Sequence, residues 1–219
     1  MRTSTLIASC VFLSFGTIFV LPLLMRGAVS SSNDSVLLKQ HKEQSAPVFS
    51  ELQHAKQQSI TVPDTASAGW HTIVDVVDGD TIDVMVGDTV QSVRLIGINT
   101  PEIANLYRFE DECFGPEAKE RLEYMLQEHD SVFLVSDASQ GDVDIYDRLL
   151  RYVYVYQEEE WVNVNFSLVY DGYAYEYTHY QNPYPYQLRP HFRLAEYYAR
   201  HWVRGLWGAC YCPQTILCS

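Results

Sequence analysis

The sequence VDGDT at residues 77–81 and the sequence VRLIGINTPE at residues 93–102 decide how the carboxyl-terminal part of the chain is built. The β-branched run at 70–77 leads into Asp-Gly, which is typical of a strand entering a tight turn. Residues 81–86 then alternate apolar and polar side chains, a Gly-Asp pair marks a second turn, and 90–96 returns as an apolar run. These features predict a three-stranded antiparallel meander.

Apolar spacing beyond the meander predicts three helices and two more strands. The helices are expected from Gly115 to near His129, over 164–170 with Gly172 as the stop, and over 192–204 after Pro190, and the strands at 131–136 and 148–156. A glycine after a helix and a proline near its start are common boundary signals. Five strands interrupted by a helix fit an α+β fold, a five-stranded OB-fold β-barrel with three helices, better than a doubly wound sheet.

The meander carries side chains suited to phosphate chemistry. An Asp-Gly-Asp turn alone is more often an ordinary hairpin than a metal site. Here Asp80 starts one strand, Arg94 lies near the end of the next, and an Asn-Thr-Pro-Glu turn follows at 99–102. These groups can therefore meet at one edge of the barrel. Hard divalent cations bind such oxygen ligands, and the arginine fork matches phosphate oxygens.

An ordered set of motifs runs from Val74 to Trp207. The motifs are DGDT at 78–81, VRLIGI-x-TPE at 93–102, FGPEA at 114–118, D-x-Y-x-R at 144–148 and GLWG at 205–208. At these residues the sequence resembles the staphylococcal-nuclease-like, or thermonuclease, family. The resemblance implies a five-stranded OB-fold barrel and a Ca²⁺-dependent nuclease. Such an enzyme hydrolyses phosphodiester bonds of single-stranded DNA and RNA with little sequence specificity.

The resemblance also implies a calcium site. Asp80 and Asn99 match its side-chain ligands, and Thr100 matches the residue whose main-chain carbonyl binds the ion. Asn99 stands where the family pattern has aspartate, which removes one negative charge from the site. Because calcium affinity depends on ligand charge, binding should weaken. Two outcomes stay open: Asp78 or Asp83 compensates, or catalysis is lost.

Three further residues match the family's catalytic groups. Arg94 and Arg148 match the arginines that hold the scissile phosphate, and Glu102 matches the carboxylate that activates or positions the attacking water. Guanidinium groups and a cation are suited to stabilise the negative charge that develops at phosphorus. Asp147 stands where a glycine often precedes the arginine. The acidic run 142–147 either pairs with Arg148 or forms a solvated loop.

Tyrosines are dense between residues 170 and 186, where seven occur. Aromatic rings stack on nucleic-acid bases without reading their sequence. Tyr180 is the best match to the family's nucleotide-binding tyrosines, and Tyr177 is the next. The competing interpretation is that most of these rings pack against the barrel.

The amino-terminal part has a different composition. Residues 6–25 are twenty mostly apolar residues, enough for a helix to cross a bilayer. Residues 1–26 are predicted to be an uncleaved signal anchor or a cleaved signal peptide. Residues 27–69 are predicted to be a disordered Ser/Gln-rich linker, and 70–219 the nuclease-like domain. We expect an exported monomer that is either membrane-anchored through the N-terminal helix, with an extracytoplasmic domain, or secreted.

Four cysteines, Cys113, Cys210, Cys212 and Cys218, lie in the predicted domain. In an oxidising compartment they are expected to form disulfides. We predict that Cys113 bonds to Cys210 or Cys212, because closing a long loop constrains the unfolded chain most. A four-thiolate zinc site is the alternative, although Cys-x-Cys is not the usual ligand spacing.

The charge of the chain excludes a basic, DNA-wrapping protein. It has 28 acidic and 15 basic residues and a formal charge of −13, and residues 70–219 alone hold 24 acidic and 10 basic residues. Substrate binding should then depend on the ion and the two arginines more than on counterion release. The alternative function is a catalytically degenerate OB-fold module that binds single-stranded nucleic acid, an oligosaccharide or a partner protein.

Overall fold

The structure is a computed structural model that describes residues 50, 53–54, 68–177 and 185–211. The predicted apolar helix at 1–26, nearly all of the predicted linker and Tyr180 lie outside the described residues. Among the helices that are described, none combines the length and the apolar character needed to cross a bilayer.

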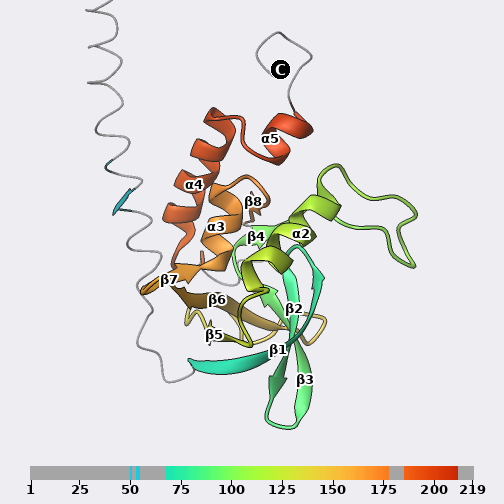
Figure 1. Cartoon of the computed structure of the whole chain (residues 1–219), viewed down its shortest axis with the longest axis vertical. Helices are drawn as coiled ribbons and strands as arrows, with labels where there is room; N and C mark the ends of the chain where they lie inside the picture. The colour runs from blue at the N-terminus through green and yellow to red at the C-terminus, as the bar shows by residue number, and fades with distance from the viewer. Residues whose placement is uncertain (1–49, 51–52, 55–67, 178–184, 212–219) are drawn as a thin grey trace, which may run out of the picture. The chain divides into compact units, whose positions relative to one another are not determined.

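Five strands form a closed barrel, as the sequence predicted (Figure 1). They are β1 (Gly69–Asp78), β2 (Thr81–Val86), β3 (Thr89–Leu95), β5 (Ser131–Val135) and β6 (Leu149–Gln157). β1, β2 and β3 make the expected antiparallel meander. A parallel pairing between β3 and β6 closes the sheet. The barrel is thus mixed, because only this closing pair runs parallel.

Strand β1 reaches both neighbouring strands by changing partners along its length. Its first part, from Gly69 to Thr72, pairs with β5, and its second part, from Ile73, pairs with β2. The register shifts twice within that second part. Such bulges bend a strand and increase its twist, which a small closed barrel requires.

Three short strands were not expected from the sequence. β4 (Ile98–Asn99) pairs with β8 (Tyr175–Glu176), and β7 (Glu160–Asn163) extends the sheet beside β6. Two-residue strands carry no periodicity, so the sequence could not reveal β4 or β8. The pairing of β4 with β8 holds the Asn99 segment beside the segment that precedes Tyr177.

Four helices gather on one side of the strands (Figure 1). They are α2 (Gly115–Leu126), α3 (Val164–Tyr170), α4 (Arg189–His201) and α5 (Leu206–Ala209). The first three confirm the predicted helices: α3 has the predicted bounds, and α2 and α4 have shifted ends. α2 ends before His129. α4 begins at Arg189, and Pro190 stands in its first turn, where the missing N–H of proline costs no helical hydrogen bond. The short α5 was not expected.

The core fills the barrel and the space beneath α3 and α4. Its largest fully buried side chains include Tyr152, Tyr154, Phe192 and Leu122. Asn165 is a fully buried polar residue, and its amide group bonds three main-chain groups. Its Nδ2 donates to the Ile96 and Arg151 carbonyls, and its Oδ1 accepts from Val153 N–H at 2.9 Å. It ties α3 to β6 and to the chain entering the site.

A disulfide joins Cys113 to Cys210 across 97 residues of sequence. This pairing confirms the predicted link between the body and the carboxyl-terminal segment. It also excludes the four-thiolate zinc site, since two of the four sulfur atoms are bonded to each other. Cys212 and Cys218 lie outside the described residues.

Candidate active site

Asp80 occupies the turn between β1 and β2, and the side chain is buried. Its amide N–H donates to Asp78 Oδ1 at 3.0 Å, and its own Oδ2 accepts from the Thr100 N–H at 3.0 Å. Gly79 permits this contact, because a Cβ there would lie 2.8 Å from the Thr100 side chain. The turn therefore brings the chain at residue 100 directly against the Asp80 carboxylate.

Arg94 lies on β3 opposite Thr81 of β2, so the pairing of these strands places it beside Asp80. Its Nη2 contacts Asp80 Oδ2 at 2.9 Å and donates to Asn99 Oδ1 at 3.1 Å. Its Nη1 donates to the Leu95 carbonyl at 2.8 Å. One guanidinium group thus bridges the two side chains that the sequence predicted as calcium ligands.

The three predicted calcium ligands lie together. Asp80 and Asn99 direct oxygen atoms at one arginine nitrogen, and the Thr100 carbonyl accepts from Asn99 Nδ2 at 3.3 Å. Within the part of the chain that the structure describes, no three His, Cys, Asp or Glu side chains gather into a metal-binding group. The donor set is one carboxylate, one amide and one carbonyl oxygen. It fits a hard cation such as calcium once Arg94 withdraws.

Two nearby carboxyl groups respond to the charge of Asp80. Burial, and then the Asp80 charge, raises the pKa of Asp78 to about 6. The same two causes, in the same order, raise the pKa of Glu102 above its ordinary value. The negative potential around Asp80 therefore extends to both groups, and a cation at Asp80 would relieve it.

Glu102 is held through its main chain. Its N–H donates to Glu112 Oε2 at 3.1 Å, and its carbonyl accepts from the Glu112 N–H at 2.8 Å. Gly115 packs against this segment, because a Cβ at residue 115 would lie 2.5 Å from the Glu102 carbonyl oxygen. Cys113, in the disulfide, directly follows Glu112. Hydrogen bonds between Glu102 and Glu112 thus close the loop between these residues at its base, and the disulfide ties it to the carboxyl-terminal segment at Cys210.

Arg148 reaches the same site from the loop before β6. Its Nε and Nη2 both contact Asp144 Oδ2 at 2.7 Å, and its guanidinium lies over the Tyr146 ring, 5.4 Å from the centroid. Its Nη1 donates to Thr81 Oγ1 at 3.4 Å, and Thr81 in turn donates to Asp80 Oδ1. A chain of polar contacts therefore connects both arginines through Asp80.

The acidic run 142–147 is not simply a solvated loop. Asp144 pairs with Arg148, and Asp142 pairs with Arg151 at 2.7 Å. Burial raises the pKa of Asp144, but hydrogen bonds from the Arg148 side chain and main chain outweigh it, so the net pKa lies below its ordinary value. Asp147 has a left-handed backbone, with φ of 60°. That conformation favours glycine, which accounts for the glycine of the family pattern.

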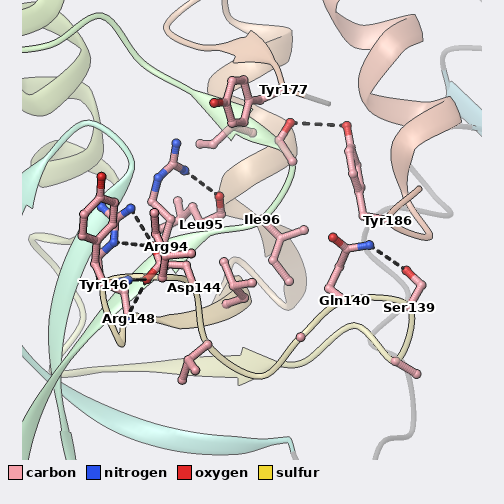
Figure 2. Close-up of a pocket in the computed structure, with 17 residues that line it drawn as sticks. Arg94, Leu95, Ile96, Ser139, Gln140, Asp144, Tyr146, Arg148, Tyr177 and Tyr186 are labelled. Carbon is pink, nitrogen blue, oxygen red and sulfur yellow. Dashed lines mark hydrogen bonds and ion pairs between the residues drawn. The ribbon is translucent and has the colours of Figure 1, made fainter. Parts of the chain in front are cut away.

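A cavity of about 670 Å³ opens beside the two arginines. Figure 2 shows Arg94 and Arg148 together at one end and Gln140 and Tyr186 at the other. Tyr177 also lines this cavity. The predicted calcium ligands and the Glu102 side chain are not part of its lining, so the arginines separate the cavity from the Asp80 carboxylate.

Tyr186 forms the far wall of the cavity and was not selected from the sequence. Its hydroxyl donates to Glu176 Oε1 at 2.8 Å, and burial followed by the Glu176 charge raises its pKa. Gly97 makes room for the ring, since a Cβ there would lie 2.6 Å from it. The density of tyrosines in the sequence indicated that rings could lie at the site, but it did not show which ring faces it. No motif in the sequence indicated Glu112, because its contacts with Glu102 depend on how the loop folds.

Comparison with known proteins agrees with this geometry. Residues 92–209, just over half of the chain, match the family described as "Staphylococcal nuclease homologue". The chain is 30% identical over 160 residues to an uncharacterized protein of Methanocaldococcus jannaschii, covering 66% of this chain and 74% of that protein. It is 30% identical over 141 residues to a micrococcal nuclease of Shigella flexneri, covering 62% and 72%. It is 33% identical over 122 residues to protein ParB of Escherichia coli, covering 51% and 62%. The chain therefore belongs to the staphylococcal nuclease family.

Proposed function

We propose that this chain is a calcium-dependent nuclease that cleaves phosphodiester bonds of single-stranded DNA and RNA. One observation carries the proposal: Arg94 and Arg148 lie at one end of a single cavity and are linked through Thr81 and Asp80. Two guanidinium groups that border one cavity suit a phosphodiester, whose charge increases as a nucleophile attacks. Membership of the nuclease family and the micrococcal nuclease relative give independent support.

In this mechanism each residue has a distinct part. Arg94 and Arg148 bind the non-bridging oxygens of the scissile phosphate and stabilise the charge that develops on them. Glu102 accepts a proton from the attacking water, and its raised pKa makes it a stronger base. Asp80, Asn99 and the Thr100 carbonyl would hold calcium, which supplies positive charge at the phosphate.

The acidic composition shapes how substrate binds. With a formal charge of −13, little affinity comes from general attraction to phosphates, so the affinity should depend on the two arginines and the ion. Tyr177, in the wall of the cavity, offers a ring on which a base can stack. Such stacking requires an unpaired base, which favours single strands. Tyr180 remains a second candidate for the same role.

A binding module without catalysis is the second candidate function. Asn99 in place of a carboxylate, and arginines already engaged with Asp80 and Asp144, favour it. We also propose that the chain is exported and acts outside the cytoplasm as a monomer, either tethered by residues 1–26 or released. The disulfide supports that location, because disulfides persist in oxidising compartments.

Cleavage of single-stranded DNA by the purified full-length chain separates the two functions. We expect cleavage with calcium, none with a chelator, and strong loss in Glu102→Ala and Arg148→Ala. Exposed residues of the same types supply the controls, Glu128→Gln and Arg193→Ala, which should retain activity. If the parent chain fails to cleave with calcium or manganese from neutral to alkaline pH, yet binds the strand, the binding module is the better description.

A further inference from the structure

The oxygen atoms expected to bind calcium are already satisfied by the chain itself. Arg94 Nη2 contacts Asp80 Oδ2 at 2.9 Å and Asn99 Oδ1 at 3.1 Å. The remaining expected ligand is the Thr100 carbonyl, which accepts a hydrogen bond from Asn99 Nδ2 at 3.3 Å. A positively charged nitrogen therefore lies between the two side-chain oxygens, where a divalent cation would otherwise bind them.

We propose that Arg94 is a built-in competitor of calcium, which must leave Asp80 and Asn99 before the ion can bind. The proposal rests on the calcium dependence proposed above and adds the residue that regulates it. The same guanidinium cannot serve as counter-ion of Asp80 and as ligand of a phosphate in the cavity at once. Calcium binding should thus release Arg94 towards the cavity, so that ion and substrate assist each other's binding.

Asn99 allows all three expected ligand oxygens to be bonded by groups of the chain itself. An amide has both an acceptor, which bonds Arg94, and a donor, which bonds the Thr100 carbonyl. A carboxylate at residue 99 has no donor and would leave that carbonyl open to a metal ion. Asn99 thus does more than remove a negative charge, because its amide group also hydrogen-bonds the Thr100 carbonyl oxygen, the third expected ligand.

Arg148 provides a matched comparison inside the same site. It also borders the cavity and also binds a carboxylate, but that carboxylate is Asp144, which is not among the predicted calcium ligands. It reaches Asp80 only through the hydroxyl of Thr81. Removing Arg148 deletes a nearby positive charge without vacating the position between Asp80 and Asn99.

Calorimetric titration of calcium into the full-length chain, without nucleic acid, tests the proposal. We expect Arg94→Met to bind calcium about tenfold more tightly than the parent, in the range typical of coupled sites. Arg148→Met should change the affinity less than about twofold. Arg94→Lys keeps the charge, but its single nitrogen cannot bond Asp80, Asn99 and Leu95 together, so its affinity should fall between those of the parent and Arg94→Met.

The outcomes separate this inference from the proposed function. Calcium binding by the parent with equal affinity in Arg94→Met, or an equal gain in Arg94→Met and Arg148→Met, would overturn the competition alone. Calcium binding by none of the four proteins would overturn the calcium dependence and the competition together. If circular dichroism shows that Arg94→Met does not fold, Arg94→Lys decides: a gain supports competition, and an affinity equal to that of the parent refutes it.

Discussion

The two arginines of the site are paired in different ways. The Arg94 side chain is 12% exposed and its partner Asp80 7%, whereas Arg148 is 27% exposed and Asp144 16%. Arg94 bonds Asp80 in the turn between β1 and β2, and also the Leu95 carbonyl and the Asn99 side chain in the stretch that follows it. Arg148 bonds mainly Asp144, four residues away in its own loop, and packs on Tyr146. The Arg94–Asp80 pair joins the turn between β1 and β2 to β3, while the Arg148–Asp144 pair stabilises a single loop.

The two arginines have the same proposed chemical role but contribute differently to the stability of the fold. A buried ion pair becomes strongly destabilising when only one partner is removed, because the other charge stays buried without compensation. A more exposed pair loses less, since water replaces the missing partner. Mutations should therefore separate the two arginines by stability although both are needed for cleavage.

The largest expected effect is on catalysis and is shared by both arginines. Arg94→Met and Arg148→Met should each lower kcat/KM for single-stranded DNA by about 10²–10³-fold, because each removes a donor that stabilises the transition state. Initial rates at saturating calcium give the measurement. A loss confined to one variant would show that only one arginine contacts the phosphate.

Stability should then distinguish the two variants. Without calcium, Arg94→Met should lower the free energy of unfolding by about 3–5 kcal/mol, since Asp80 is left buried without its partner. Arg148→Met should lower it by only about 1 kcal/mol. Urea unfolding followed by circular dichroism measures both, and equal losses would contradict the contrast drawn from burial.

The disulfide lies beside the segment that holds Glu102, since Cys113 directly follows Glu112. Replacing Cys113 and Cys210 by serine should lower the free energy of unfolding by about 2–4 kcal/mol, because a long loop becomes unconstrained in the unfolded chain. Urea unfolding measures the loss, and a reducing agent added to the parent should reproduce it. An unchanged midpoint in both experiments would argue against this pairing in solution.

Asp144→Asn tests the more exposed pair through pH. The pKa of Asp144 lies below its ordinary value of 3.8, so its ionised form stabilises the fold above that pH, and this contribution is lost as pH falls through the lowered pKa. At neutral pH we expect the variant to lose about 1 kcal/mol. Unfolding measured at steps from pH 7 to below the lowered pKa should show the gap closing, and a gap that widens on acidification would have the wrong sign.

The smallest effect concerns the turn that positions Arg148. Asp147 has φ of 60° and is exposed, so Asp147→Gly relieves backbone strain without removing a buried contact. The variant should gain about 0.5 kcal/mol of stability, less than the full left-handed cost because aspartate tolerates this region. Thermal unfolding at matched pH detects the shift, and a lower midpoint would show that the aspartate side chain stabilises the turn.

The sequence was most informative where structure is local. The five barrel strands and three longer helices follow from alternation, helical spacing and turn residues within short windows, and all were predicted close to their observed positions. The strands β4, β7 and β8 and the helix α5 were missed. They are two to four residues long and exist because tertiary partners hold them.

For the site, the motifs indicated which residues meet but not what each one contacts. Asp80, Arg94, Asn99, Thr100 and Arg148 were selected because they match the motifs of the nuclease family, and they do lie together. That Arg94 takes the position between Asp80 and Asn99, that Asp144 engages Arg148, and that Tyr186 faces the cavity were decided by the packed chain. Local pattern sets strands and turns, whereas side-chain partners depend on barrel closure, which joins β3 to β6 across more than fifty residues of sequence.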